Sequence, residues 1–420
     1  MEKQFDQLNK GTNKLSIGNL LLILVSYSII GYYIIALLVP QYELLWTVSV
    51  IALEICLILF VRKSIIIDNN VILWFLFVLL SLLGIVFTRN ITGQKLIFLL
   101  SLIFMLLTYN IASTSGPMVK IIYQGIRIIS IFLATGSILQ LVNLNLLMTI
   151  NSAVMPSETY NEFLNWVSSN RLVGYFSQSG TNGFVLSVLI STMVVSFYDS
   201  RKFSKKVIII IGMVIVLYFL FLTGKRGFIF YNIINILILA PFFIKNKYTV
   251  PIVVTFFVGI FSYILFNSAI GTDVLMRFDV FDVSSGRFQL NELMIKDIVE
   301  KPIFGWGTYT TFEDLNLKLD GHNIYLQVFR ENGLFGFVVL IVFIIMNFIK
   351  NLKLLFISRF GSKELGFLIF SLYNQLLFVF WGLTGNPLYD GYPLLIYFIS
   401  IIICEYIQRL YKNDIEEGKI

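Results

Sequence analysis

Residues 17–39 read IGNLLLILVSYSIIGYYIIALLV, a run without a charged side chain. A helix of this length crosses about 30 Å of hydrocarbon. Because no small-residue cleavage site follows the run, we interpret it as a retained membrane helix and not as a signal peptide. The run decides the fold, since similar runs recur along the whole chain.

The recurring apolar runs predict an all-α polytopic membrane protein with about twelve transmembrane helices. The expected spans cover residues 17–39, 43–61, 71–88, 95–113, 119–142, 181–199, 206–223, 227–244, 249–267, 331–349, 364–384 and 391–408. These runs lack the short polar–apolar alternation of a transmembrane β-barrel. We expect residues 1–420 to form a single integral membrane domain.

The composition agrees with a membrane protein. The 420 residues are 57% hydrophobic and 13% charged, and the mean hydropathy is +0.85. A soluble domain carries about 25% charged residues. The net charge of +7 fits loop lysines and arginines that orient the protein, and it does not indicate a nucleic-acid partner. Cys56 and Cys404 lie inside apolar runs and suggest neither a disulfide framework nor a metal site.

The basic loops fall on one side of the membrane. With a cytoplasmic N-terminus, that side receives VRKS, DSRKFSKK, KNK, KNLKLLFISRFGSK and the tail QRLYKNDIEEGK. The positive-inside rule therefore predicts that both termini are cytoplasmic. The opposite, extracytoplasmic side receives two long loops, residues 143–180 and 268–330.

Four basic side chains from four different loops fall on the extracytoplasmic side, namely Arg171, Arg226, Arg287 and His322. Cations are sparse on that side, so a shared anionic ligand is one explanation. Each residue also has an ordinary explanation. Arg226 follows a span end and is placed to snorkel into the headgroups, and Arg171 is placed to pair with Glu162.

The large loop, residues 268–330, is the longest polar interval of the chain. Ser284 or Ser285 is placed to cap a helix over about 286–300, and Pro302 ends it. Its apolar stripe consists of Leu290, Leu293, Met294 and Ile298. This pattern predicts an amphipathic helix on the membrane surface or a helix packed on the bundle.

His322 is the only histidine of the chain and lies in GHNIYLQVFRENG. An imidazole titrates near pH 6.5 and serves as a neutral base at physiological pH. Asp320 is close enough in sequence to orient the ring. Arg330 and Glu331, further along the motif, are expected to form an ion pair at the membrane edge.

Several segments resemble the O-antigen polymerase and ligase family of the Wzy and WaaL type. They are RLVGYFSQSGTNGF (171–184), LTGKRGFI (222–229), SSGRF (284–288), KPIFGWG (301–307) and GHNIYLQVFRENGLFGF (321–337). Where the family usually has serine before the arginine of the second motif, this chain has Lys225. The resemblance implies a GT-C-type membrane fold and an inverting, metal-independent glycosyltransferase whose donor is a glycan on undecaprenyl diphosphate.

The resemblance also implies roles for particular residues. Arg171 and Arg226, assisted by Lys225, would bind the diphosphate, because guanidinium groups neutralise such anions bidentately. Arg287 would contribute to the same contact as a catalytic residue, and His322 would be the base or a group that positions the acceptor. The glycan would contact a further set of side chains, Trp306, Tyr309, Asn323 and Tyr325.

No cofactor or metal is expected. Metal-using membrane glycosyltransferases tend to present carboxylates in the first outer loop, where this chain has Glu43 alone. Asp279 and Asp282 have oxygen ligands of the kind that hard cations prefer, but we interpret them as solvated surface residues.

The favoured function is therefore a polysaccharide polymerase for capsule, exopolysaccharide or O-antigen synthesis in a bacterial cytoplasmic membrane. Its partners would be undecaprenyl-diphosphate-linked repeat units, membrane lipids and, as an option, a chain-length regulator. An O-antigen-ligase-like transfer to a lipid core or protein uses the same residues. A lipid-linked glycan transporter is the alternative from another class, and it would place charges inside the spans. Only Glu54 and Arg127 stand out there.

Overall fold

The computed structural model describes residues 17–62, 65–88, 92–243, 259, 287–309, 322–357 and 362–417. These residues form helices and connecting turns, and no β-strand occurs among them. Ten of the helices are long and apolar enough to cross a membrane. The expectation of an all-α, multi-pass membrane protein is confirmed.

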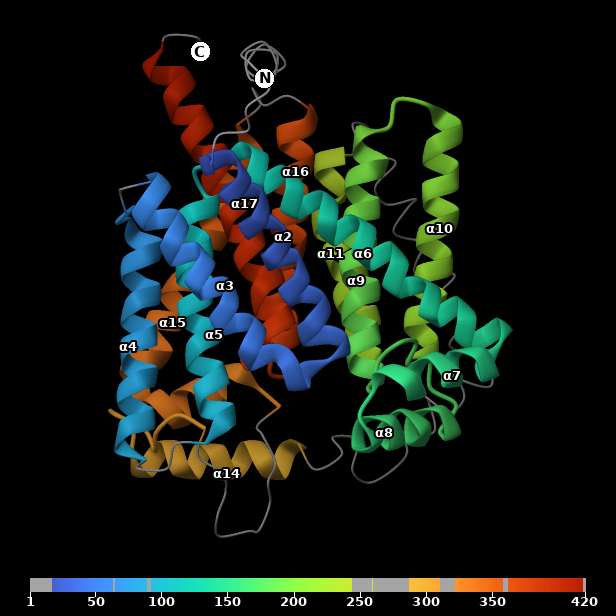
Figure 1. The fold of residues 1–420 in the computed structure, drawn as a ribbon, viewed down its shortest axis with the longest axis horizontal. Coiled ribbons are helices and arrows are strands. Elements are labelled where there is room, and N and C mark those ends of the chain that lie inside the picture. The colour runs from blue at the N-terminus through green and yellow to red at the C-terminus, as the bar shows by residue number, and fades with distance from the viewer. Residues whose placement is uncertain are drawn as a thin grey trace.

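The N-terminal half contributes six of these helices (Figure 1). The elements of this half are α2 (Ile17–Leu38), a short 3₁₀ turn (Pro40–Tyr42), α3 (Glu43–Leu57) with a π-helical extension (Ile58–Arg62), α4 (Asn69–Phe87), α5 (Gly93–Ala112), α6 (Gly116–Val142), α7 (Leu144–Val154), α8 (Ser157–Ser168) and α9 (Ser179–Asp199). Of these, α7 and α8 are too short to span a membrane.

The C-terminal half contributes the other four long helices. Its elements are α10 (Phe203–Leu222), α11 (Arg226–Phe243), α14 (Arg287–Glu300), α15 (Ile324–Phe356), α16 (Ser362–Gly382) and α17 (Gly391–Glu416). The expected span 227–244 corresponds to α11, whose apolar stretch is shorter than those of the ten long helices. The expected span 249–267 lies outside the described residues, as do Asp279, Asp282, Ser284, Ser285 and Asp320.

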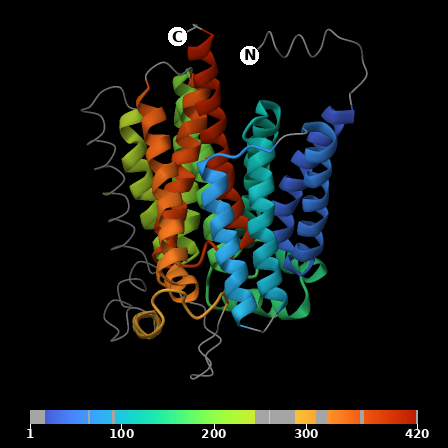
Figure 2. The same ribbon diagram turned by 90° about the vertical axis from the view of Figure 1, so that its left-hand side faces the viewer.

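Three helices outside the spans gather at one end of the bundle. Figure 1 shows α7, α8 and α14 there, with α14 lying across the direction of the spanning helices, and Figure 2 shows α14 nearly end-on. The C-terminal part of α17 extends beyond the opposite end. We call the end with α7, α8 and α14 the site end, because all the expected site residues that the structure describes belong to connections at this end.

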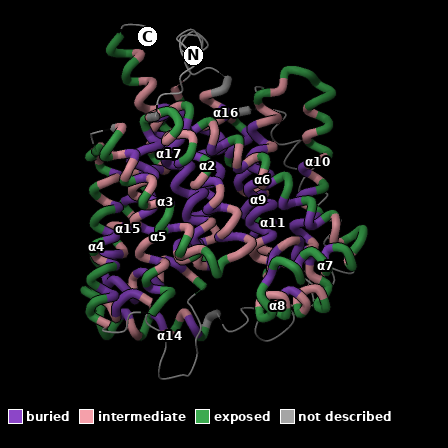
Figure 3. Tube along the Cα trace, viewed as in Figure 1, coloured by how far each residue is buried: buried purple, intermediate pink, exposed green. Residues whose placement is uncertain are grey.

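Buried residues concentrate in the middle of the bundle (Figure 3). Helix α16 packs against α9, α11, α15 and α17. Several polar side chains in this core are paired across helices, because an unpaired amide in hydrocarbon is costly. Asn232 donates to Ser187 Oγ at 2.7 Å, and Asn374 donates to Ser191 Oγ at 3.2 Å.

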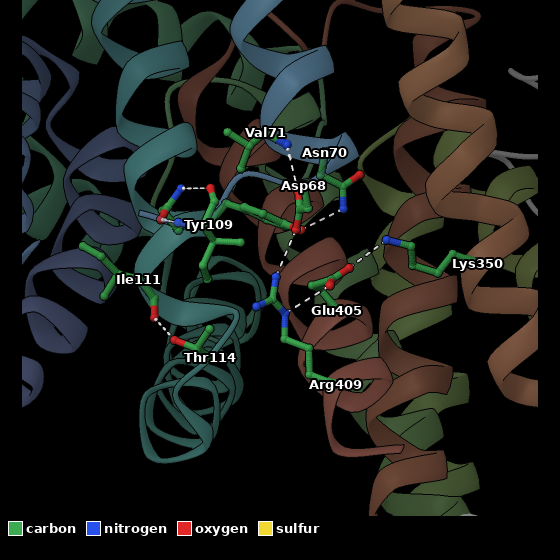
Figure 4. Close-up of polar contacts among 11 residues, drawn as sticks. Asp68, Asn70, Val71, Tyr109, Ile111, Thr114, Lys350, Glu405 and Arg409 are labelled. Atoms are coloured by element: carbon green, nitrogen blue, oxygen red, sulfur yellow. Dashed lines mark hydrogen bonds and ion pairs between the residues drawn. The ribbon is translucent and has the colours of Figure 1, made fainter. Parts of the chain in front are cut away.

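A charged network joins four segments at the opposite end (Figure 4). Arg409 of α17 contacts Asp68, which caps α4, at 3.0 Å, and Glu405 at 3.1 Å. Lys350 of α15 contacts the other oxygen of Glu405 at 2.7 Å. The hydroxyl of Tyr109 in α5 donates to Asp68 at 2.7 Å. Two cations and two carboxylates therefore compensate one another and hold α4, α5, α15 and α17 together.

The connection 143–180 contains two helices that the sequence did not predict. Helices α7 and α8 form a small apolar core of their own with the segment that follows them. Leu147, Phe163 and Val173 are fully buried in it. The apolar residues are spread over two short helices and a turn, so no single run is long enough to indicate a span.

Helix α15 begins at Ile324, seven residues before the start of the expected span 331–349, which lies within it. Asn323 caps the helix through its side-chain oxygen, which accepts from the backbone N–H groups of Tyr325 and Leu326 at 3.0 and 3.2 Å. The helix is interrupted at Gly333, whose φ is 64°. The first turns of α15 thus form a separate piece at the site end.

Candidate functional site

Arg171 lies in a segment without regular structure that is held by hydrogen bonds from four neighbouring helices. Its carbonyl accepts from Gln140 Nε2 of α6 at 2.8 Å, and its N–H donates to the carbonyl of Trp166 at 3.0 Å. Leu172 donates to the carbonyl of Leu222 in α10 and accepts from Asn182 of α9. The backbone at Arg171 is therefore fixed although it is not helical.

The side chain of Arg171 lies against the turn between α10 and α11. Gly224 of this turn has a φ of 67°, and a β-carbon added there would overlap the guanidinium group of Arg171. The turn continues into Lys225 and Arg226, and Arg226 is the first residue of α11. Residues that are more than fifty positions apart in sequence are thus brought together. We call Arg171, Lys225 and Arg226 the basic corner.

Lys225 lies over the ring of Trp166, with Nζ at 4.9 Å from the ring centroid. It also lies near the start of α9, because a β-carbon on Gly180 would be 3.9 Å from its Nζ. The neighbouring Ser179, the first residue of α9, is fully buried, and its hydroxyl has no hydrogen-bond partner. A hydroxyl in this situation suits a ligand oxygen.

The basic corner has the electrostatics of an anion site. Helices α9 and α11 both begin there, at Ser179 and Arg226. Helix N-termini carry unsatisfied N–H groups and a partial positive charge that favour anions. Two helix starts and three cationic side chains make the same region attractive to a phosphate-like group.

His322 is exposed and lies directly before Asn323, the cap of α15. The oxygen of Asn323 is occupied by capping, and the hydroxyl of Tyr325 donates to the carbonyl of Val379 in α16 at 2.9 Å. Ile324, which lies between these two residues, is fully buried. Of this motif, His322 is therefore the residue that faces solvent at the site end, while Asn323 and Tyr325 have contacts that stabilise the fold.

The turn at 301–309 is fixed onto α15 by the break at Gly333. Leu334 donates to the carbonyl of Pro302, and Trp306 and Gly307 donate to carbonyls of α15 next to the break, each at 2.8 Å. The indole N–H of Trp306 donates to the carbonyl of Asp297 at 2.8 Å, and Lys301 lies 3.6 Å from the ring centroid. Trp306 thus joins α14 to the turn.

Tyr309, the last described residue of this turn, packs among aromatic rings. Its ring meets Tyr389 at 5.2 Å and Phe98 at 5.5 Å between centroids, and Phe98 stacks on Tyr389 at 4.9 Å. Its backbone has a φ of 56°. The expected glycan-contacting tyrosine therefore forms part of an aromatic group at the site end.

Glu331 is buried. The neighbouring Arg330 forms an ion pair with Asp297 of α14 at 2.5 Å, which the sequence did not indicate. Glu331 accepts from Gln327 Nε2 at 2.9 Å and from the hydroxyl of Tyr389 at 2.8 Å. Asn386 in turn donates to Gln327 Oε1 at 2.9 Å. We call Gln327, Glu331, Asn386 and Tyr389 the amide cluster.

Helix α11 and the start of α15 both contact the end of α16 or the residues that follow it. Tyr231, on the second turn of α11 after Arg226, shares a hydrogen bond of 2.5 Å with Thr384. A β-carbon on Gly382 would be 2.7 Å from the Ile324 side chain. The connection between α16 and α17 therefore contacts both α11 and α15.

Arg287 is the first residue of α14, and the helix expected over 286–300 is confirmed. Its apolar stripe packs as predicted, with Leu290 and Met294 buried next to Leu326. The side chain of Arg287 lies outside the described part of the structure. Among the described residues, no three His, Cys, Asp or Glu side chains come together as metal ligands.

Sequence reasoning missed Trp166, Gly224 and the amide cluster. Gly224 had a usable signal, since a glycine between two helical runs often marks a left-handed turn. The amide cluster had none, because Asn386 and Tyr389 lie in a short loop far in sequence from Gln327 and Glu331.

Comparison with known families supports the resemblance inferred from the motifs. Residues 211–341 match the family model described as O-antigen ligase. The matched part contains Lys225, Arg226, Arg287 and His322, and it ends before the amide-cluster residues Asn386 and Tyr389. The curated proteins gave no match to the chain.

The match supports a glycan-transfer role in the O-antigen and polysaccharide families. The fold is consistent with this glycan-transfer role, because a multi-pass helical bundle gathers cationic side chains and a histidine at one end. Residues 211–341 are thus the part of the chain that is similar to the O-antigen ligase family.

Proposed function

We propose that this protein is a polysaccharide polymerase that transfers a glycan from undecaprenyl diphosphate to another lipid-linked repeat unit. The observation that carries the proposal is the contact between Arg171 and the Gly224–Arg226 turn. This contact forms an anion site from Arg171, which lies outside the matched residues 211–341, and the Gly224–Arg226 turn, which lies inside them. A leaving diphosphate needs this kind of site, because charge accumulates on it as the glycosidic bond breaks.

In the proposed reaction, the basic corner binds the diphosphate, and Arg287 adds a further guanidinium. An acceptor hydroxyl attacks the anomeric carbon, the bond to the diphosphate oxygen breaks, and His322 takes the hydroxyl proton. The bond changes balance without a redox step. The site end would face the extracytoplasmic side, with both termini in the cytoplasm.

The ligase reaction is the second candidate, and the description of the matched family as O-antigen ligase favours it. It uses the same donor chemistry with a lipid core or a protein as acceptor. Transport of the lipid-linked glycan receives less support, since the charged side chains Asp68, Lys350, Glu405 and Arg409 compensate one another at the opposite end.

The proposal is tested with purified protein in detergent, lipid-diphosphate-linked repeat units as the sole glycan, and EDTA. A polymerase produces a ladder of lengthening chains on a gel. We expect the ladder to disappear in His322→Ala and to weaken strongly in Arg287→Lys, because lysine keeps the charge but lacks the planar fork. Single-transfer products that form only after a lipid core is added would instead indicate the ligase.

A further inference from the structure

We propose that the amide cluster, together with the aromatic group around Tyr389, is an acceptor-sugar subsite separate from the basic corner. The inference rests on the proposed glycan transfer and deepens it. A transferase of this kind needs one place for the donor diphosphate and another for the sugar that carries the attacking hydroxyl.

The location of the cluster fits this role. Gln327 lies on the first turns of α15, and its N–H donates to the carbonyl of Asn323 at 2.9 Å, so it is about one helical turn from His322. Asn386 and Tyr389 lie in the loop between α16 and α17, which also contacts α11 through Thr384. The cluster therefore includes a residue on the first turns after the candidate base, and its loop is connected to the helix that starts with Arg226.

The hydrogen bonds of the cluster have a defined direction. Both carboxylate oxygens of Glu331 accept, one of them from Gln327 Nε2. The amide oxygen of Gln327 must then face Asn386, whose Nδ2 donates to it. Consequently the Oδ1 atom of Asn386 points away from the cluster. Glu331 thus sets the orientation of the Gln327 amide, which in turn sets that of the Asn386 amide. The orientation of an amide group is assigned from such hydrogen-bond networks.

Asn386 Oδ1 is buried and has no hydrogen-bond partner. Leaving a buried acceptor without a donor is energetically unfavourable, so a donor is expected in the working state. A sugar hydroxyl is a suitable donor. The flanking loop residues Thr384 and Asp390 are exposed, which places the loop at the surface where a small shift would admit the sugar.

The rings next to the cluster supply the apolar part of a sugar site. Tyr389 belongs both to the cluster, through its hydroxyl, and to the aromatic group with Phe98 and Tyr309. Small-molecule sites combine apolar and aromatic walls with a few placed polar groups. In this assignment Asn386 contacts the sugar, and Gln327 and Glu331 are positioning residues that act through it.

The test separates sugar binding from diphosphate binding with two probes. One is the repeat-unit oligosaccharide released from its lipid by mild acid, and the other is glycan-free undecaprenyl diphosphate. Affinities are measured by titration of the full-length protein in detergent. We expect Asn386→Ala to weaken oligosaccharide binding about tenfold or more and to change undecaprenyl diphosphate binding by less than about twofold. Lys225→Met should show the reverse pattern.

A reciprocal exchange tests the positioning role. Glu331→Gln alone removes the group that orients Gln327, and it should weaken oligosaccharide binding. In the double variant Gln327→Glu and Glu331→Gln, a carboxylate at position 327 still accepts from Asn386 Nδ2, so affinity should be largely restored. A purely structural role predicts no such rescue. Asn145→Ala, an exposed site-end asparagine on α7, is the control and should leave both affinities unchanged.

Unchanged oligosaccharide affinity in Asn386→Ala, or an equal loss for both probes, would overturn the subsite. Failure of the proposed glycan transfer, by polymerase or ligase, gives a different result. In that case the parent protein would yield no transfer product and would not bind undecaprenyl diphosphate. Transfer by the parent protein together with unchanged sugar affinity in the variants would reject the subsite alone.

Discussion

The guanidinium group of Arg171 occupies the space beside Gly224 that any larger residue would need. This contact joins the segment after α8 to the turn between α10 and α11. It also explains the glycine, since the φ of 67° at this position disfavours other residues.

Gly224→Ala should therefore move Arg171 and strain the turn. We expect the transfer rate to fall about tenfold or more, which corresponds to about 1.4 kcal/mol or more in the barrier. Initial rates of ladder formation provide the measurement. Gly93→Ala is a matched control, because nothing lies within 4 Å of a β-carbon there. Equal activity of the two variants would contradict a role for the Arg171 position.

Trp166 should support Lys225 through its ring. An exposed cation–π contact contributes about 0.5–1 kcal/mol, so Trp166→Leu should weaken undecaprenyl diphosphate binding about two- to fivefold. The check is a double-mutant cycle measured by ligand titration. In a Lys225→Met background the same substitution should have no further effect. Additive losses would mean that Trp166 acts independently of Lys225.

Gly333→Ala should detach the turn at 301–309 from α15. The residue has a φ of 64°, and a β-carbon would overlap the carbonyl of Ile303. Strained backbone of this kind costs about 1–3 kcal/mol. We expect a lower Tm in detergent and faster proteolysis near the turn. An unchanged Tm would show that the break is not needed for the fold.

Arg409→Met should lower stability without changing the chemistry. It removes both ion pairs of Arg409 at the opposite end from the site (Figure 4). Since the side chain is partly exposed, we expect a loss of about 1–3 kcal/mol, seen as a lower Tm, with transfer per folded molecule preserved. Arg201→Met, an exposed arginine between α9 and α10, should change the Tm little. A selective loss of activity in Arg409→Met would point to coupling between the two ends.

Much of the fold was predictable because every helix that spans the hydrocarbon must be long and apolar. Long apolar runs, such as 17–39 and 119–142, became helices α2 and α6 close to the expected limits. The apolar run begins later than helix α15 for a physical reason. Polar residues such as Gln327 and Glu331 make its first turns look like loop, yet they are buried in hydrogen bonds with one another.

For the site, sequence supplied the residue types and the structure supplied their pairing. Loop topology and the family resemblance pointed to Arg171, Lys225 and Arg226, which the fold brings to one corner. They did not indicate that Asn323 and Tyr325 contribute their polar atoms to helix capping and packing. Such assignments depend on partners far away in sequence, such as Val379, and no local pattern encodes them.

Helix α14 has a further consequence for how the protein works in a bilayer. It lies across the bundle and presents Ile295 and Val299 to the surroundings, next to the exposed Phe304 of the following turn. These side chains suit the acyl boundary below the headgroups. Since the turn is fixed to α15, the depth of α14 in the lipid sets the height of His322 above the hydrocarbon. We therefore expect the transfer rate to depend on bilayer thickness. Reconstitution in lipids of different acyl-chain length should shift this rate in proportion to the hydrophobic mismatch.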